Sequence, residues 1–464
     1  MCIEYSLTAK DIQEQAEFLK ELHGKYGSYF CSKTKSLSKQ SYEYLKGQLL
    51  CEKRRNMSKM EKQTSDLNNQ ALSHFISNSP WDEEPLIEKI GNDVSEIICK
   101  DGPAALIFDE SGFKKQGNQS VGVARQFCGN LGKVDNCQVG VFLALANFQQ
   151  VAMIDKRLYL PKIWTEDKKK RRKAGIPDDV VFQTKSELAI EMLLQAKQRQ
   201  IPFRFVSFDC YYGLQAPLLT KLDGSFEYYA DIPCDTRVYL EYPKVGIPPK
   251  KGVKGRTPSK LKVIGGTPIE VQELLSDPQF VWDTFKIRNT QRGELWVKFA
   301  ALRVYRIDNK LPVQSPVWLL IKQDLESNEI RFSFSNASAD TPKSTLAQNQ
   351  CLRYWVERSI EDAKQLAGMA EYQFIGWRAW HHHMALVFLA MLFLLLLQQR
   401  LINKAPMLTL FDARDILLVV IPRKTLSYQE AVEVISRKHL NRFFSRRSHY
   451  NKQKVRLRES GILM

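Results

Sequence analysis

Apolar and polar positions recur with two different periods along this chain. Residues 1–95 contain stretches such as KDIQEQAEFLKELHGKYG, in which apolar residues repeat at helical spacing. From residue 104 the pattern changes to apolar runs separated by glycine-rich turns, namely AALIFDE, SVGVARQFCG and CQVGVFLALAN. Runs of this kind are typical of β-strands joined by short links. The chain therefore begins with a helical region and continues into a sheet.

Strands and helices alternate in the next segment, up to residue 234. KSELAIEMLLQAKQRQ (185–200) predicts an amphipathic helix, and FRFVSFD (203–209) predicts a fourth strand. LQAPLLTKLD then predicts a second helix and FEYYADI (226–232) a fifth strand. Three adjacent strands followed by this alternation indicate a mixed α/β sheet that helices cover.

Residues 235–335 interrupt the alternation. YPKVGIPPKKGVKGRTPSKLK has seven basic residues, four prolines and no acidic residue, which predicts a flexible cationic loop. WVKFAALRVYRI, VWLLIK and IRFSFSN follow as strand-like runs. We therefore expect a β-rich insertion within the sheet domain.

Helical spacing returns in LAQNQCLRYWVERSIEDAKQLAGM and in MALVFLAMLFLLLL, residues 384–397. The second stretch has 14 residues, whereas a membrane span needs about 20 apolar residues. We interpret it as a fully buried core helix, and we expect no membrane association. A membrane-associated basic protein is the alternative that this stretch leaves open.

The charge balance narrows the class of partner. The chain has 68 Lys and Arg residues against 51 Asp and Glu residues, a net charge of +17. An excess of this size favours polyanionic partners such as nucleic acid. The nine cysteines are scattered without a C-x-x-C pair, which argues against a zinc finger or a disulfide framework. The N-terminal segment has no basic-then-apolar signal pattern, so we expect a cytoplasmic protein with reduced thiols.

Several basic clusters are candidates for contact with a nucleic-acid backbone. KKKRRK (168–173) predicts a cationic loop, and the proline-rich loop contributes Lys254 and Arg256. Residues 437–458 hold nine Lys and Arg residues with aromatic side chains between them. CEKRRNMSKMEK, which begins at residue 51, either binds phosphates or forms a solvated helix face.

Two of the predicted strands end in an aspartate. AALIF leads to Asp109 and FRFVSF leads to Asp209, each followed by a turn. If the strands are neighbours, the two carboxylates emerge side by side, and paired oxygen ligands attract Mg²⁺ or Mn²⁺. A single aspartate at a strand end is usually a turn former. Glu110 points to the opposite face of the strand, so we expect it to lie outside the metal site.

The helix RYWVERSIEDAK offers a third acid, which a site for two ions requires. Arg353, Glu357 and Lys364 are spaced i, i+4 and i+11, which places them within about 40° of one another on a helix. A carboxylate between two cations suits a site that grips phosphates. An i,i+4 ion pair of Arg353 with Glu357 is the structural alternative. Glu361 lies one turn beyond Glu357 and is the second candidate for the third acid.

Several blocks of sequence resemble insertion-sequence DDE transposases of the DDE superfamily endonuclease type. They are DESGFKKQGNQSVGVARQFCGNLGKVDNCQVGV, FDCYYG, and RYWVERSIEDAKQLAGM with the later YQFIGWRAWHHH. The resemblance covers about residues 70–400. Within this family, the sequence is similar to the cut-and-paste branch, whose third acid lies in a Y-x2-R-x3-E-x6-K signature.

This resemblance implies an α/β fold with a ribonuclease-H-like mixed-sheet catalytic core. The two parts of the core would be residues 96–234 and 336–400, on either side of the β-rich insertion at 235–335. A helical DNA-binding region at 1–95 and a basic C-terminal region at 401–464 complete the expected organisation.

The resemblance also assigns roles to individual residues. Asp109, Asp209 and Glu357 would be the catalytic acids and would hold two Mg²⁺ ions, for which Mn²⁺ can substitute. Arg353 and Lys364 match the Arg and Lys of the signature and would contact DNA.

One position departs from the signature. Gln350 stands where the family pattern has Tyr. Tyr354 offers a hydroxyl nearby, but it lies on a different face of the helix.

The implied activity is metal-dependent cleavage of DNA at transposon ends, followed by strand transfer into target DNA. The partners would be terminal inverted repeats and target DNA, bound by a homodimer at the bacterial nucleoid. Arg125 and Lys133 of the first block would lie near DNA. A flipped base would need a stacking aromatic; Trp282, Trp296 and Trp318 are candidates, although we expect each to be a core residue.

Two further points bear on function. The alternative to an active enzyme is a catalytically inactive, transposase-derived DNA-binding protein, but such a protein has no physical need for three metal ligands. His381, His382 and His383 are consecutive, and neighbouring helical residues point about 100° apart. We therefore expect them to serve packing at the start of a helix and not to share one metal ion.

Overall fold

The computed structural model describes residues 6–52, 54–63, 67–249, 258–277, 280–290 and 293–421, together with isolated positions between 432 and 451. Lys254 and Arg256 lie outside the described residues, as does most of the basic segment 437–458.

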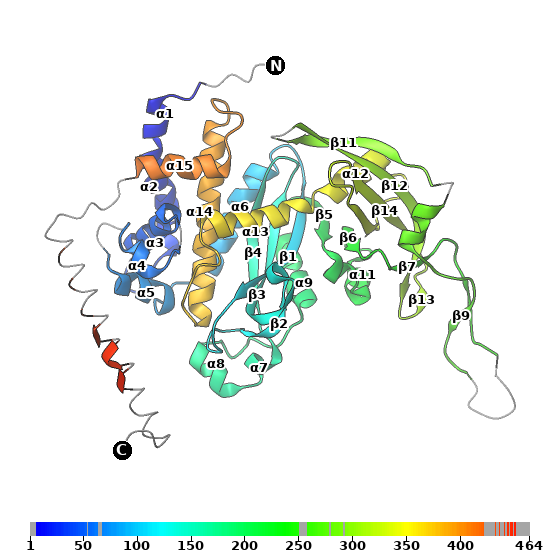
Figure 1. Ribbon diagram of the computed structural model, residues 1–464, viewed down its shortest axis with the longest axis horizontal. Helices are drawn as coiled ribbons and strands as arrows, with labels where there is room; N and C mark the ends of the chain where they lie inside the picture. Colours follow the sequence, from blue (N-terminus) through cyan, green and yellow to red (C-terminus); the bar gives the residue numbers. More distant parts are fainter. Residues whose placement is uncertain are drawn as a thin grey trace.

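Within these residues, thirteen strands form one mixed sheet (Figure 1). The strand order is β10-β7-β12-β14-β15-β6-β5-β1-β3-β2, with β4 against β3 and with β11 and β13 against β12. β1, β5 and β6 are parallel neighbours, whereas β3 is antiparallel to β1. The predicted mixed α/β sheet is therefore confirmed. The first six strands are β1 (Ala104–Lys114), β2 (Ala124–Cys128), β3 (Lys133–Ala146), β4 (Val151–Tyr159), β5 (Phe203–Phe208) and β6 (Glu227–Ile232).

β1 is longer than the sequence pattern predicted. The apolar run was expected to end at Asp109, but the strand continues to Lys114. The reason is its partner, because β3 pairs with β1 as far as Lys114 opposite Cys137. Ser111, Gly112 and Phe113 are buried beyond the acids. Asp109 therefore lies inside a strand and not at its end.

The strands after β6 extend the same sheet outward. β15 pairs antiparallel with β6, and β14 and β12 follow. These strands and a separate small hairpin of β8 and β9 are β7 (Arg237–Tyr239), β8 (Lys244–Gly246), β9 (Lys262–Gly265), β10 (Ile269–Glu270), β11 (Asp283–Thr290), β12 (Gly293–Asp308), β13 (Leu311–Pro312), β14 (Val317–Asp324) and β15 (Ile330–Ser335).

The N-terminal helices share one hydrophobic core with the sheet. Figure 1 shows them, in blue, packed beside the long helix α14. The Tyr44 hydroxyl lies 2.9 Å from Nδ1 of His383 in α14. The N-terminal helices are α1 (Ala9–Gln13), α2 (Gln15–Tyr26), α3 (Ser38–Leu50), α4 (Met57–Met60), α5 (Asn69–Ser77) and α6 (Glu84–Ile98), with the 3-10 turn η1 (Gly27–Tyr29).

One residue of the basic cluster near residue 51 has a structural role. Arg55 is buried, and its Nε donates to the Gln48 carbonyl at 2.8 Å. Its Nη2 donates to the Leu366 carbonyl at 3.1 Å, and its Nη1 pairs with Glu371 at 3.0 Å. Arg55 therefore joins the N-terminal helices to the end of α13 and presents no free cation to DNA or solvent.

Helix α14 runs through the centre of the molecule as the predicted buried core helix. It spans 25 residues, so the apolar run 384–397 is only its middle part. Its length and composition would allow it to cross a membrane, but 78% of its most apolar 18-residue window is buried within the protein. The remaining helices are α7 (Lys162–Thr165), α8 (Lys168–Ala174), α9 (Lys185–Gln198), α10 (Cys210–Gly213), α11 (Ala216–Leu222), α12 (Lys343–Cys351), α13 (Tyr354–Leu366), α14 (Trp377–Leu401) and α15 (Leu410–Val420), with the 3-10 turns η2 (Gly129–Leu131) and η3 (Val271–Ser276).

Candidate active site

The parallel pairing of β1 with β5 brings two aspartates together. The last paired residues are Ile107 and Ser207. The next residues, Phe108 and Phe208, stack with ring centroids 4.7 Å apart. Asp109 and Asp209 follow them directly in the sequence. Two segments a hundred residues apart in the chain therefore present neighbouring carboxyl groups.

Asp209 also serves as the cap of a short helix. β5 ends at Phe208 and α10 begins at Cys210. The Asp209 Oδ1 accepts hydrogen bonds from the backbone N–H of Tyr211 at 3.1 Å and of Tyr212 at 3.4 Å. Asp209 therefore has the turn-forming role that is usual for a single aspartate at a strand end. These hydrogen bonds also fix the position of its carboxyl group beside β1.

The protonation of this pair reflects its surroundings. Burial is the largest effect on Asp109, and the neighbouring Asp209 adds to it, so that the pKa of Asp109 rises to about 8. Burial also raises the pKa of Asp209, and Arg353 opposes this rise. Two partly buried carboxyls of this kind cannot both ionise without a compensating cation. Their oxygen donors and their shared charge fit a divalent metal ion such as Mg²⁺.

Arg353 connects helix α13 to this pair. It precedes the first turn of α13, and its side chain is almost fully buried. Its Nη2 donates to Oε1 of Glu357 at 2.6 Å, and its Nε pairs with Oδ2 of Asp231 at 2.6 Å. The Arg353 charge opposes the rise in the pKa of Asp109.

The two candidates for the third acid have different surroundings. Glu357 is bonded to Arg353 and is among the charges that raise the pKa of Asp109. Glu361 instead accepts a hydrogen bond from Nε2 of Gln365 at 2.8 Å. The i,i+4 ion pair that was the structural alternative is therefore present at Glu357, together with an approach to Asp109.

Asp231 is a fourth carboxylate of the site, and the sequence interpretation missed it. It lies on β6, beside β5, and is buried. The Ser333 hydroxyl donates to its Oδ1 at 2.6 Å, and Gln350 Nε2 donates to the same hydroxyl at 2.7 Å. A signal was available, because FEYYADI is a third apolar run that leads to an aspartate, as the first two do.

Gln350, at the position of the signature tyrosine, is buried. Its amide supports Asp231 through Ser333. Tyr354 is exposed, and its ring lies beneath the guanidinium of Arg288 at 5.4 Å. The structure therefore keeps Gln350 inside the protein and leaves Tyr354 on the surface.

The predicted DNA-binding residues occupy two kinds of position. Lys364 Nζ donates to the Asn130 side chain at 3.1 Å, and burial lowers its pKa while Asp109 raises it. Lys364 is thus bonded to the turn that joins β2 to β3 and lies within the electrostatic reach of Asp109. Arg125 and Lys133 are exposed on those two strands.

Two expectations about side chains away from the carboxylates were wrong. The Trp296 side chain is 41% exposed and not part of the core. Trp296 pairs with Lys286 of β11 and lies just outside the part of β12 that pairs with β14. KKKRRK forms helix α8 and not a loop, because Asp167 caps its N-terminus by accepting from the N–H groups of Lys169 and Lys170.

Trp282 and Trp318 are half-buried. Trp282 packs against Phe280, and the Trp318 indole donates to the Ser338 carbonyl at 3.0 Å.

The three consecutive histidines are buried and have separate partners, as expected for a packing role. His383 lies against Tyr44, and the ring nitrogens of His382 lie 2.9 Å from the carbonyls of Ile76 and Trp81. His381 lies beside Lys156 and Glu83.

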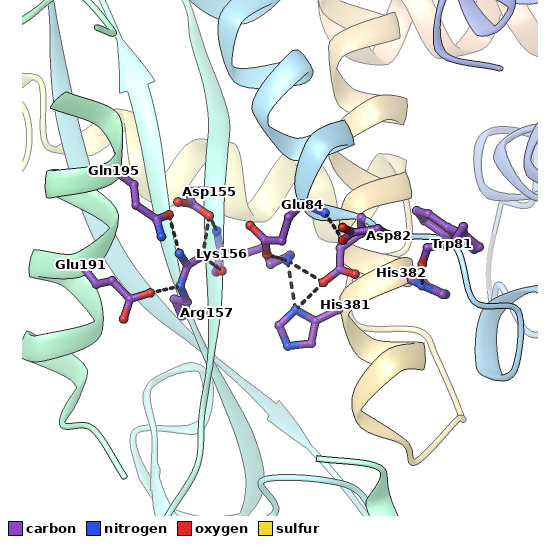
Figure 2. A network of polar contacts seen from close by, with 11 residues as sticks. Trp81, Asp82, Glu84, Asp155, Lys156, Arg157, Glu191, Gln195, His381 and His382 are labelled. Carbon is purple, nitrogen blue, oxygen red and sulfur yellow. Dashed lines mark hydrogen bonds and ion pairs between the residues drawn. The ribbon is translucent and has the colours of Figure 1, made fainter. Parts of the chain in front are cut away.

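A second cluster of acidic residues lies around a buried cation. Glu83, Glu84 and His381 bring their ligand atoms within 4.8 Å of one another. Figure 2 shows the fully buried Lys156 ammonium directed at the same point. It lies 3.3 Å from Glu83 and 3.1 Å from Glu84. Lys156 already neutralises these carboxylates, so we assign no metal to them.

Comparison with known proteins identifies the class. A family model described as DDE superfamily endonuclease matches residues 29–294, which is more than half of the chain, and the chain belongs to this family. The matched segment includes Asp109 and Asp209 and ends before Glu357.

Among curated proteins, the chain is similar to the probable transposase for insertion sequence element IS701 from Microchaete diplosiphon. The two are 31% identical over 198 residues, which cover 41% of this chain and 48% of the relative. The likeness thus spans about half the length of that relative. Together, the family and this relative confirm the resemblance to insertion-sequence DDE transposases.

Proposed function

We propose that this protein is an active transposase that cleaves DNA at transposon ends and joins the released ends to target DNA. The observation that supports this most is the pairing of Asp109 with Asp209, each with a raised pKa, at the meeting of β1 and β5. Such carboxyls are unfavourable neighbours unless a cation lies between them. An inactive DNA-binding protein would gain nothing from this arrangement.

The acids of the site fit two divalent ions. Asp109, Asp209 and Glu357 would hold two Mg²⁺ ions, which when bound supply an activated attacking oxygen and charge neutralisation at the leaving oxygen. Arg353 orients Glu357 through a 2.6 Å hydrogen bond, and Asp231 holds Arg353 in place through an ion pair. Lys364 lies on the same side and is suited to bind a DNA phosphate.

The reaction then has two balanced steps. In cleavage, a water oxygen bonds to phosphorus, the bond from phosphorus to the 3′-oxygen breaks, and the 3′-oxygen leaves as a hydroxyl with the proton. In strand transfer, that 3′-hydroxyl attacks a phosphorus of target DNA and displaces a target 3′-oxygen. Both steps proceed without a covalent link to the protein.

The wider organisation is part of the same proposal. Residues 96–234 and 336–400 would be the ribonuclease-H-like core and 235–335 its insertion, with DNA-binding regions at 1–95 and 401–464. Two transposon ends must be processed together, so we expect a homodimer on paired terminal inverted repeats. It would act in the bacterial cytoplasm at the nucleoid.

A cleavage assay tests this function. Wild type, Asp109→Asn and Asp209→Asn are incubated with Mg²⁺ and DNA that carries the inverted repeats flanking the gene. We expect each substitution to lower cleavage by about a thousandfold, or ~4 kcal/mol, while DNA binding in EDTA is retained. Asp179→Asn, a change at an exposed acid, is the matched control and should cleave normally. Equal cleavage by all four proteins would contradict the assignment.

A further inference from the structure

A cavity of about 720 Å³ lies away from the candidate active site. It is formed where α5, α8 and the start of α14 meet, near the lower end of α14 in Figure 1. None of Asp109, Asp209 and Glu357 lines it. Its volume is in the range of small-molecule binding sites, about 300–1,000 Å³.

The first turn of α14 presents unpaired backbone donors to this cavity. Gly376 is the N-cap residue and provides no side chain to cap the helix. The N–H groups of residues 377–379 have no acceptor in the described part of the chain. Because α14 is 25 residues long, its N-terminus also carries the positive end of a full helix dipole. Such an end favours an anion.

His381 is a buried polar side chain in the same cavity. It is 5% exposed and lines the cavity. The Lys156 ammonium can only donate, and its three contacts are Glu83, Glu84 and His381 Nδ1 at 3.0 Å. Nδ1 also lies 3.1 Å from Oε1 of Glu83, so Lys156 and Glu83 occupy this ring nitrogen and Nε2 is the one left for another partner. Figure 2 shows this second nitrogen directed away from Lys156.

That Nε2 has no hydrogen-bond partner among the described residues. The indole nitrogen of Trp81, another cavity residue, is likewise buried and unpaired in this part of the chain. A buried polar group without a hydrogen-bond partner is destabilising. Two such groups at one cavity, one of them the N–H donor of Trp81, indicate that a polar ligand completes the site.

Three cations and an aromatic ring line the same cavity. Arg172, Lys173 and Arg378 line the cavity, and none of them forms an ion pair within the described residues. Of the lining acids, Glu83 is neutralised by Lys156 and Asp82 caps the N–H of Glu84.

Trp377 is half-buried at the cavity and packs on His381 with ring centroids 4.3 Å apart. The combination of three cations and a flat ring suits a nucleotide.

We propose that this cavity binds a nucleoside phosphate unit of a DNA strand, with the phosphate on Arg172, Lys173 and the N-terminus of α14 and the base against Trp377. The proposal rests on DNA being the substrate of this protein. The unit would be a strand end or an extruded nucleotide, because a base inside a duplex is not accessible to such a cavity. The cavity thereby holds DNA at a second point, separate from the carboxylates.

Binding of deoxyadenosine 5′-monophosphate tests the proposal by isothermal titration calorimetry of the full chain in EDTA. We expect the wild type to bind the nucleotide at one saturable site. Deoxyadenosine, which lacks the phosphate, should bind to this site at least about tenfold more weakly. The Arg172→Ala/Lys173→Ala double variant should lose binding of the nucleotide to the same extent. Trp377→Leu should weaken the nucleotide but leave inorganic phosphate unchanged.

The matched control is Arg204→Ala/Lys221→Ala. Both of its residues are exposed, and Lys221 lies in the last turn of a seven-residue helix, as Lys173 does. This control should bind as the wild type does. A 5′-phosphorylated single-stranded 20-mer should displace the nucleotide; if it does not, the ligand is a free nucleotide and the proposal is overturned.

Absence of nucleotide binding, or an equal loss in the control, overturns the proposal as well. The metal-dependent cleavage assay separates this outcome from failure of the proposed function. If the wild type cleaves DNA but the cavity variants bind the nucleotide as well as the wild type does, only the proposal for the cavity is disproved.

Discussion

Arg353 forms a 2.6 Å ion pair with Asp231, and both side chains are almost completely buried, at 9% and 11% exposure. The pair joins the start of α13 to strand β6 of the central sheet. Because Arg353 also holds Glu357, the position of the third candidate acid depends on a carboxylate that is not itself one of the three.

This pair predicts a large loss of stability when its cation is removed. Arg353→Ala leaves Asp231 buried without its partner, and breaking a buried pair costs about 3–5 kcal/mol. We expect the free energy of unfolding in urea, measured in EDTA, to fall by about 3 kcal/mol. Arg331→Ala breaks an exposed pair with Glu329 and should cost less than about 1 kcal/mol. Equal effects would show that the buried pair does not anchor α13.

The identity of the third acid can be decided by two matched substitutions on one helix. Glu357→Gln removes a carboxylate next to Arg353, whereas Glu361→Gln removes one bonded to Gln365. We expect Glu357→Gln to lower the rate of DNA cleavage about a thousandfold and Glu361→Gln to change it less than about threefold. The reverse result would make Glu361 the ligand.

Gly213 predicts a steric requirement next to Asp209. A Cβ atom added at Gly213 would lie 1.9 Å from the backbone carbonyl oxygen of Asp231, which cannot move without moving β6. Gly213→Ala should therefore displace α10 and the Asp209 cap, lowering stability by about 1–3 kcal/mol and reducing cleavage. Gly24→Ala, at a helical glycine with open space around it, should not lower thermal stability. A stable, active Gly213→Ala variant would contradict the packing of α10 on β6.

Buried histidines predict how stability depends on pH. Burial lowers the pKa of His23 to about 4 and of His383 to about 3, from an ordinary 6.5. At pH values between the lowered pKa and the ordinary 6.5, the unfolded chain binds more protons than the folded chain does. Unfolding therefore becomes easier as the pH falls from 6.5 toward 4. Each such histidine contributes a slope of up to about 1.4 kcal/mol per pH unit.

His23→Gln tests this, because Gln keeps a polar group near the Ser41 hydroxyl, which lies 2.8 Å from Nε2 of His23. Urea unfolding measured from pH 7 to pH 4 should give a shallower slope for the variant by about one proton. An unchanged slope would show that His23 is not the neutral buried group inferred from its surroundings.

The local parts of the candidate site could be predicted from the sequence. FRFVSF forms β5, which ends at Phe208, and Asp209 follows as the cap of α10. Both were predictable because a short apolar run and a capping residue are properties of neighbouring positions. Arg353, Glu357 and Lys364 lie on one helix face for the same reason, since helical spacing fixes their relative direction. The apolar run 384–397 was likewise sufficient to predict a buried core helix.

Tertiary structure decided the relationships between distant segments. β1 continues past Asp109 because β3 pairs with it, and no local pattern records the length of a partner strand. Asp231 is part of the candidate site because β6 lies beside β5. Gln350 supports it because β15, which carries Ser333, lies beside β6.

The cavity at the start of α14 is a result of the same kind. It exists because α5, α8 and the start of α14, which are far apart in the sequence, meet there. Periodicity specifies the face that an element buries, but which elements meet there follows from the packing of the whole chain.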